Sequence, residues 1–136
     1  MYNCTYMELI VDTSVLMAVV LNEPEKDSLI KATKEHEIVG PSSICCEIGN
    51  AFSAMMRRKR LGLTDALKGY ELFEKIPIRY LEVNMHRALK IAAENNIYAY
   101  DAYFIECALH YGYPLISLDE ELICCSKKYR ISMITI

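Results

Sequence analysis

Apolar residues along this chain occur in two patterns: short continuous runs, and positions spaced along one face of a helix. Short apolar segments at 8–12, 37–40, 78–83 and 115–118, and a last one at 131–136 with some alternation, predict strands. Helical spacing predicts helices at 14–21, 25–36, 42–60, 64–76, 84–95 and 101–111, with a short helix before the last strand. Strands that alternate with helices form a parallel sheet covered on both faces. We therefore expect an α/β fold, a flavodoxin-like three-layer α/β/α arrangement with a five-stranded parallel sheet.

Residues that favour helix caps mark several of the helix ends. Ser42 or Ser43 would cap the helix at 42–60, Thr64 the next one, and Asn84 the helix at 84–95. We expect Asp101 to be the first residue of the helix at 101–111. Only three residues join that helix to the strand at 115–118. The helix must therefore run antiparallel to the strand and begin at the carboxyl edge of the sheet.

Four acidic residues are predicted to meet at this edge. Asp12 closes the first strand, Asp119 directly follows the strand at 115–118, and Glu47 lies in the second turn of the helix after the strand at 37–40. Asp101 begins a helix at the same edge. Ligands of open α/β sheets bind at the carboxyl ends of the strands. Four converging carboxylates there suit a hard divalent cation.

Each acid also has a simpler interpretation. Asp12, Asp101 and Asp119 are typical N-cap residues, and for any one of them alone capping is the favoured explanation. Glu47 differs, because it lies at the margin of the apolar stripe of its helix, where a carboxylate needs a partner. Asn50, one turn further on, is the candidate to hydrogen-bond it.

Length and composition limit the range of interpretations. With 136 residues, 53% of them hydrophobic and 24% charged, the chain is expected to form a single globular domain over 1–136. Residues 1–7 are expected to form a flexible N-terminal extension. No apolar run is long enough to span a membrane, and the N-terminus lacks the pattern of a signal peptide. We therefore expect a cytoplasmic protein that has no membrane partner.

The net charge of −3 provides no overall positive field for a nucleic acid, although an acidic metal site would itself lower that total. A local basic run, Arg57, Arg58, Lys59 and Arg60, ends the helix at 42–60. Its simpler interpretation is a solvated last turn that complements the helix dipole, and the alternative is contact with phosphate or a partner. The three histidines, at 36, 86 and 110, are scattered and are expected to be surface or hydrogen-bonded residues.

The six cysteines fall at 4, 45, 46, 107, 124 and 125, without the spacing of a zinc site. We expect them to be buried, reduced thiols. Cys45 and Cys46 are about 100° apart around a helix axis, so they are not expected to chelate one ion together.

Taken in order, four short motifs resemble those of PIN-domain ribonucleases, and in size the chain resembles the VapC toxins of prokaryotic toxin–antitoxin pairs. The resemblance covers residues 8–136. Ser117 is a departure, because the family more often has Thr two residues before its last acid; a hydroxyl is nevertheless retained. The motifs are Val11-Asp12-Thr13-Ser14-Val15-Leu16, Glu47-Ile48-Gly49-Asn50-Ala51, Tyr100-Asp101-Ala102-Tyr103 and Ser117-Leu118-Asp119-Glu120-Glu121-Leu122.

The resemblance implies a PIN-like fold and an endoribonuclease that depends on Mg²⁺ or Mn²⁺. Asp12 and Asp101 would be direct metal ligands, and Glu47 and Asp119 would bind a second ion or hold waters. The products would carry a 5′-phosphate and a 3′-hydroxyl. The resemblance also implies a homodimer, and inhibition by a small VapB-like antitoxin that lays a helix along the toxin. The supporting polar residues would be Thr13, Ser14, Asn50 and Ser117.

Other classes with an acidic pocket fit less well. A phospho-acceptor receiver domain has paired acids after its first strand, and a haloacid-dehalogenase-type phosphatase has Asp-x-Asp there. This chain has Asp12 alone, with Ser14 at the position of the second acid. The alternative that remains is a non-catalytic or differently targeted PIN-like module that binds RNA or protein.

Overall fold

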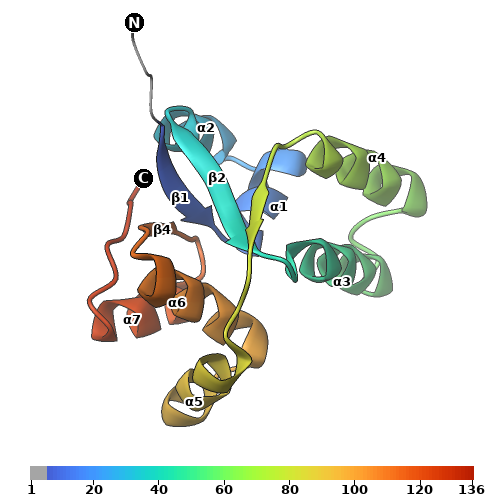
Figure 1. Cartoon of the computed structure of the whole chain (residues 1–136). Helices are drawn as coiled ribbons and strands as arrows, with labels where there is room; N and C mark the ends of the chain where they lie inside the picture. The colour runs from blue at the N-terminus through green and yellow to red at the C-terminus, as the bar shows by residue number, and fades with distance from the viewer. Residues whose placement is uncertain (1–5) are drawn as a thin grey trace, which may run out of the picture.

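The computed structural model describes residues 6–136, in which helices and strands alternate along most of the chain. Figure 1 shows a twisted sheet with the helices packed around it. In chain order the elements are β1 (Met7–Val11), α1 (Thr13–Val20), α2 (Lys26–Thr33), β2 (His36–Pro41), α3 (Ile44–Arg57), α4 (Leu63–Glu74), β3 (Arg79–Leu81), α5 (Met85–Asn95), α6 (Ala99–Tyr111), β4 (Leu115–Ile116) and α7 (Glu120–Lys128).

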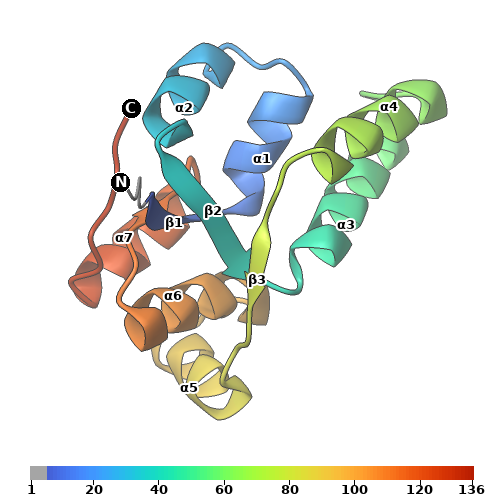
Figure 2. The ribbon, with the colours of Figure 1, turned by 45° about the horizontal axis from the view of Figure 1, so that its top comes forward.

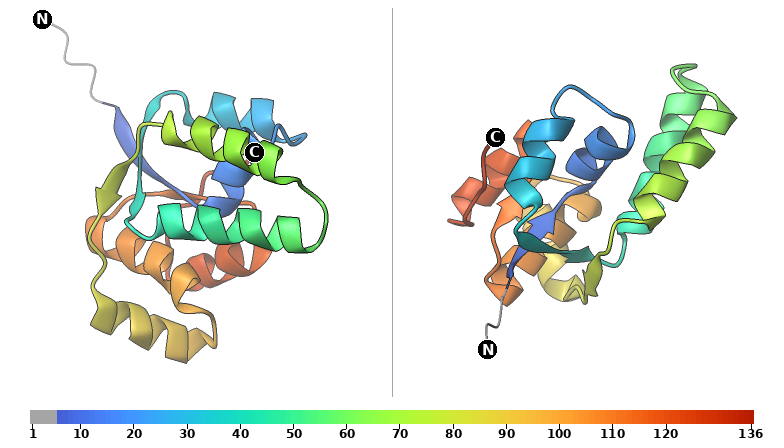
Figure 3. Two further views of the ribbon diagram at one scale, coloured as in Figure 1. Left: turned by 90° about the vertical axis from the view of Figure 1, so that its right-hand side faces the viewer. Right: turned by 90° about the horizontal axis from the view of Figure 1, so that it is seen from above.

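The sheet is parallel throughout and has the order β3-β2-β1-β4. Its central strand β1 places Met7 opposite His36 on one side and Ile10 opposite Leu115 on the other. The chain moves from β1 to β2 to β3 in one direction and then crosses back to β4. Right-handed crossovers therefore put α1–α4 on one face and α5 and α6 on the other, as Figures 2 and 3 show. The predicted parallel α/β architecture is confirmed.

The predicted fifth strand at 131–136 is wrong. This segment makes one isolated bridge, between Met133 and Leu115, so the sheet of the described residues has four strands. The segment pairs through Leu115: the Leu115 N–H donates to the Ser132 carbonyl, and the Leu115 carbonyl accepts the Ile134 N–H. Because β4 is only two residues long, it offers no longer stretch along which this pairing could continue.

Three further details differ from the predictions. Met7 belongs to β1, so it is not part of a flexible extension. Of the other residues of the predicted extension, Tyr6 precedes β1 without regular secondary structure, and residues 1–5 lie outside the described residues. The helix predicted to be capped by Thr64 begins one residue earlier, and its cap position, Gly62, has no side chain to donate or accept a bond. Asn84 does cap α5, by accepting a bond from the Arg87 N–H.

The core lies on both faces of the sheet and extends up to the carboxyl ends of the strands. Leu9, Ile10 and Leu115 are fully buried within the sheet, and α3 contributes Ile44 and Ile48. This packing fixes the angle at which α1, α3 and α6 meet the carboxyl edge. None of the helices in the described part of the chain is long and apolar enough to cross a membrane.

Candidate functional site at the carboxyl edge of the sheet

Asp12 is the centre of a hydrogen-bond network at the end of β1. It is 4% exposed and caps α1, because its Oδ1 accepts the Val15 N–H at 3.1 Å. The same oxygen accepts the Ser14 hydroxyl at 2.7 Å, and Oδ2 accepts the Ser117 hydroxyl. Capping and participation in a buried polar site are therefore not alternatives for this residue.

The two serines also tie Asp12 to the loop after β4. Ser14 Oγ accepts the Leu118 N–H and Ser117 Oγ accepts the Asp119 N–H, each at 2.9 Å. Each hydroxyl therefore donates to Asp12 and accepts from the backbone of the segment that ends in Asp119. Ser14 and Ser117, both predicted as supporting residues, link the ends of β1 and β4.

Glu47 lies in the first turns of α3 and is held by two hydroxyl groups. Thr13 donates to its Oε1 at 3.1 Å, and Ser43 donates to its Oε2 at 2.8 Å. Ser43 occupies the N-cap position but makes no side-chain cap bond, so its hydroxyl is used for Glu47. Asn50, the predicted partner, is exposed, and its carbonyl accepts a bond from Ser53. The structure records no bond between the Asn50 side chain and Glu47.

Asp101 and Asp119 occupy different positions relative to their helices. Asp119 caps α7, since its Oδ1 accepts the N–H groups of Glu121 and Leu122 at 2.9 and 3.2 Å. Asp101 was expected to start its helix, but α6 begins at Ala99, so Asp101 is the third residue of the first turn. It is therefore not a cap. The side chain of Asp101 lies at the same carboxyl edge without a capping role.

Shifted pKa values show that these acids influence one another. Burial, followed by the charges of Asp101 and Asp12, raises the pKa of Glu47 to about 7, although the Ser43 and Thr13 hydroxyls oppose the shift. Burial, then Asp119, Glu121 and Asp12, raises the pKa of Asp101 to about 6. Burial also raises the pKa of Asp12, to which Asp119 adds. The four predicted acids thus form one electrostatic group.

In the described part of the chain, no basic side chain forms an ion pair with this group. Among residues 6–136 the ion pairs involve Arg79 and His110, whose acidic partners are Glu8, Glu37 and Glu106. Uncompensated carboxylates at a sheet edge provide the oxygen donors that Mg²⁺ and Mn²⁺ prefer. In the part of the chain that the structure describes, however, no three of these side chains are gathered closely enough to hold one ion. The donor chemistry fits a hard cation, and binding requires the carboxylates to draw together.

Two residues of this region were not singled out from the sequence for the roles they have. Ser43 was considered only as a cap, yet it binds Glu47; its spacing of four residues from Glu47 is the signal that was available. Glu121 raises the pKa of Asp101 and lies in the first turn of α7. Its position two residues after Asp119 places it at the same carboxyl edge of the sheet.

The basic run lies at the end of α3, where Arg57 is the last helical residue and Arg58 the C-cap. All four basic side chains are exposed. Arg58 lines a hollow of about 490 Å³ between α1 and α3, together with Ser14 and Leu118, which also belong to the network around Asp12. The basic run, which consists of Arg57, Arg58, Lys59 and Arg60, is therefore connected to the acidic edge through this hollow.

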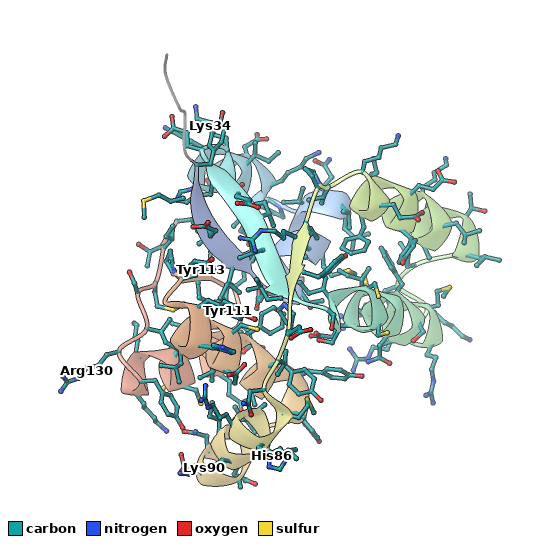
Figure 4. The ribbon with its side chains drawn as sticks, viewed as in Figure 1. Lys34, His86, Lys90, Tyr111, Tyr113 and Arg130 are labelled. Atoms are coloured by element: carbon teal, nitrogen blue, oxygen red, sulfur yellow. The ribbon has the colours of Figure 1, made fainter. Side chains whose placement is uncertain are left out.

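The histidines and cysteines differ partly from the predictions. His86 is exposed and points away from the fold on α5 (Figure 4), whereas His36 has a buried Nδ1 without a partner. His110 lies 3.3 Å from the buried Glu106. The prediction of buried thiols holds for Cys107 and Cys125 and is wrong for three others, because they project from helix faces that no element covers. The exposed thiols are Cys45, Cys46 and Cys124; Cys4 lies outside the described residues.

This fold, with acidic residues at the carboxyl edge of its parallel sheet, is matched over residues 9–125 by the model of the PIN domain family. The chain belongs to the PIN-domain family, which confirms the resemblance seen in its motifs. Its similarity to curated relatives is distant. Ribonuclease VapC9 of Mycobacterium tuberculosis and a VapC ribonuclease of Mycobacterium bovis are each 28% identical over 116 residues, which cover 84% of this chain and 87% of theirs.

Solved structures show the same architecture. PAE2754 from Pyrobaculum aerophilum matches with a TM-score of 0.70 and 25% identity, over 94% of this chain and 83% of that one. VapBC2 from Rickettsia felis, solved bound to a DNA fragment from their promoter, matches with a TM-score of 0.64 over 94% and 98%. At 12% identity the second likeness is one of fold alone.

Proposed function

We propose that this protein is a Mg²⁺- or Mn²⁺-dependent endoribonuclease of the VapC type. The observation that carries the proposal is the group of acids at the carboxyl edge. The pKa values of Asp12, Glu47 and Asp101 are raised, and among residues 6–136 no basic side chain forms an ion pair with the group. The names of the mycobacterial relatives, VapC ribonucleases, support the choice of RNA as substrate.

Asp12 and Asp101 are proposed as the direct ligands, with Glu47 and Asp119 completing the site or holding waters. A bound divalent cation supplies an ionised water near neutral pH and neutralises charge on the scissile phosphate. The chain's own contribution is to orient the carboxylates. Ser14 and Ser117 hold both oxygens of Asp12, so its orientation is set before any ligand arrives.

Glu47 and Asp101 are partly protonated near neutral pH, since their pKa values are about 7 and about 6. Binding of a cation would displace these protons, and a carboxylate without a cation would remain available to take up a proton from water. Thr13 and Ser43 hold Glu47 at a fixed position for either task.

We propose that the RNA backbone lies along the basic run. Arg58 lines the hollow that reaches Ser14. An RNA strand with one phosphate bound at Arg57 or Arg58 would therefore extend along this hollow toward Asp12. Arg58→Ala should therefore weaken RNA binding and reduce its dependence on salt, without affecting Mn²⁺ binding. Fluorescence anisotropy at two salt concentrations measures this effect. Equal binding by the two proteins would exclude Arg58 from the RNA path.

The same hollow is proposed to take a helix of a VapB-like antitoxin. Met17, Leu21 and Met55 line it, and Glu23, Glu25 and Arg58 provide charges around them, which suits an amphipathic segment. A homodimer is proposed as well, and α4 offers exposed apolar side chains for it in Leu63, Leu67 and Leu72. Light scattering after size exclusion tests the dimer, and co-expression with a small protein encoded beside the gene tests the antitoxin.

Cleavage of a mixed structured RNA pool with Mn²⁺, with Mg²⁺ and with chelator tests the main proposal. Wild-type protein should cleave only with metal, leaving 5′-phosphate ends, and an Asp12→Asn/Asp101→Asn variant should be inactive. Cleavage by the variant would indicate a contaminating nuclease or another site. RNA binding without cleavage by a folded, metal-bound wild type would favour the non-catalytic PIN-like module.

A further inference from the structure

Two adjacent cysteines form an exposed pair of thiols in the first turn of α3. Cys45 and Cys46 are both free and exposed, and their Sγ atoms lie 4.0 Å apart. The separation of about 100° around an ideal helix led to the expectation that they do not act together. That expectation concerned an ideal helix; at this exposed end of the helix the two sulfurs lie close to one another, which reopens the question of a ligand shared by both.

A second adjacent pair in the same chain provides a contrast. Cys124 and Cys125 are neighbours in α7, but Cys124 is exposed while Cys125 is 5% exposed and belongs to the core. Only one sulfur of that pair is available to a ligand from solvent. Adjacency in sequence therefore does not by itself produce a two-sulfur site, and only the Cys45–Cys46 pair presents both thiols.

A single atom bound to both sulfurs is within reach of the pair. Two sulfurs held at about 2.3 Å from one tetrahedral centre lie roughly 3.8 Å apart, and a pyramidal centre with a lone pair, such as trivalent arsenic, draws them closer still. The exposed thiols, 4.0 Å apart, need only a small rotation of their side chains to reach this geometry. A disulfide fits this geometry less well. Cα atoms joined by a trans peptide are about 3.8 Å apart, whereas disulfides usually need about 4.4 Å or more.

The number of donor side chains near the pair indicates which kind of atom could bind both sulfurs. A structural zinc ion needs four protein donors, and within residues 6–136 no three His, Cys, Asp or Glu side chains are grouped to hold a metal. A trivalent arsenical that carries one organic group needs only two sulfurs.

We propose that Cys45 and Cys46 form a binding site for trivalent arsenicals, which bridge the two sulfurs as a cyclic dithiolate. With an aryl arsenoxide the As–O bonds break and two As–S bonds form. The two thiol protons leave with the oxygen as one molecule of water. Arsenic stays trivalent and neither sulfur is oxidised, so the step needs no oxidant or reductant.

Phenylarsine oxide is the probe for this site, and intact-mass spectrometry is the measurement. All proteins carry Cys4→Ser, which removes the cysteine outside the described residues. The parent protein should take up one arsenical per chain, and the adduct should survive excess monothiol but be removed by dithiothreitol. Cys45→Ser and Cys46→Ser should each lower the adduct retained in monothiol at least tenfold. Cys124→Ser is the matched control and should behave as the parent.

Circular dichroism of each variant shows whether it is folded, so a loss of adduct in a folded Cys45→Ser protein supports the site. Three results would overturn the proposal. They are the absence of a dithiol-reversible adduct on the parent, an unchanged adduct in the Cys45→Ser/Cys46→Ser protein, and loss of the adduct on Cys124→Ser. The last result would place the arsenical at the α7 pair instead.

Discussion

At the scale of single residues, one carboxylate performs two tasks whose requirements differ. Asp12 caps α1 through Oδ1 and is held by Ser117 through Oδ2, although burial raises its pKa. The hydrogen bonds need an acceptor at this position, whereas the proposed metal site needs a negative charge. A substitution that removes the charge but keeps an acceptor oxygen should therefore impair the proposed metal site while leaving the fold largely intact.

Asp12→Asn should abolish cleavage but leave the fold stable. The amide keeps one acceptor oxygen for the Val15 N–H and the Ser14 hydroxyl, while the Ser117 hydroxyl loses its acceptor and must take a bond from the amide NH2. The free energy of unfolding should therefore change by only about 1 kcal/mol. Asp12→Ala removes the cap and leaves two hydroxyls without their acceptor, which should cost about 2–3 kcal/mol. Urea unfolding of the two variants measures the difference. Equal stability of Asn and Ala variants would contradict the structural role described for Asp12.

At the scale of elements, α3 carries Glu47, the Cys45–Cys46 pair and the start of the basic run, and its position depends on how it packs against α4. Phe52 of α3 lies over Gly69 of α4: a Cβ at residue 69 would come within 2.6 Å of Phe52 Cζ. The absence of a side chain at Gly69 is therefore what allows the two helices to approach. Gly49, on the exposed side of α3, has no such neighbour within 4 Å.

Gly69→Ala should destabilise the protein by about 1–3 kcal/mol, because Phe52 or the whole of α4 must move. Gly49→Ala is the matched control, since it adds the same methyl group in a helix without a clash. It should stabilise the protein by roughly 0.5–1 kcal/mol through helix propensity. Thermal unfolding of both variants provides the test. A neutral or stabilising Gly69→Ala would show that the α3–α4 contact is looser than described.

Several elements could be predicted from the sequence, and the reasons for the failures are physical. Chain connectivity alone placed Asp12, Asp101 and Asp119 at one edge, because parallel strands end on the same side. The last strand was not predictable in this way, since apolar alternation at 131–136 does not reveal that β4 has only two residues. Nor could the sequence show that Ser43, and not Asn50, bonds to Glu47, because this depends on side-chain rotamers at the start of α3.

At the scale of the whole molecule, the acidic edge makes folding depend on pH. The folded pKa of Glu47 is about 7 against an ordinary 4.5, and that of Asp101 is about 6 against 3.8. Between the ordinary and the raised values, the folded protein binds more protons than the unfolded chain. Stability from this site is therefore fully present below about pH 4 and is lost progressively as the pH rises to about 7.

The melting temperature in chelator should accordingly be higher at pH 5.5 than at pH 8. Glu47→Gln removes the charge, keeps one acceptor oxygen for one of the two hydroxyls, and presents an amide N–H that the other hydroxyl can accept. It should raise the melting temperature at pH 8 by a few degrees and flatten the pH profile. Glu71→Gln, an exposed change on α4, is the control and should leave the profile unchanged. A Glu47→Gln protein with the parent's pH profile would contradict the assigned shift.

Calorimetric titration of Mn²⁺ into metal-free protein near pH 7.5 shows whether the acids at the carboxyl edge bind a divalent cation, with the Asp12→Asn/Asp101→Asn variant measured beside the wild type. Wild type should bind Mn²⁺ saturably with release of protons, and the folded variant should not bind it. No binding to wild type, or equal binding to both proteins, would rule out a cation site at these acids.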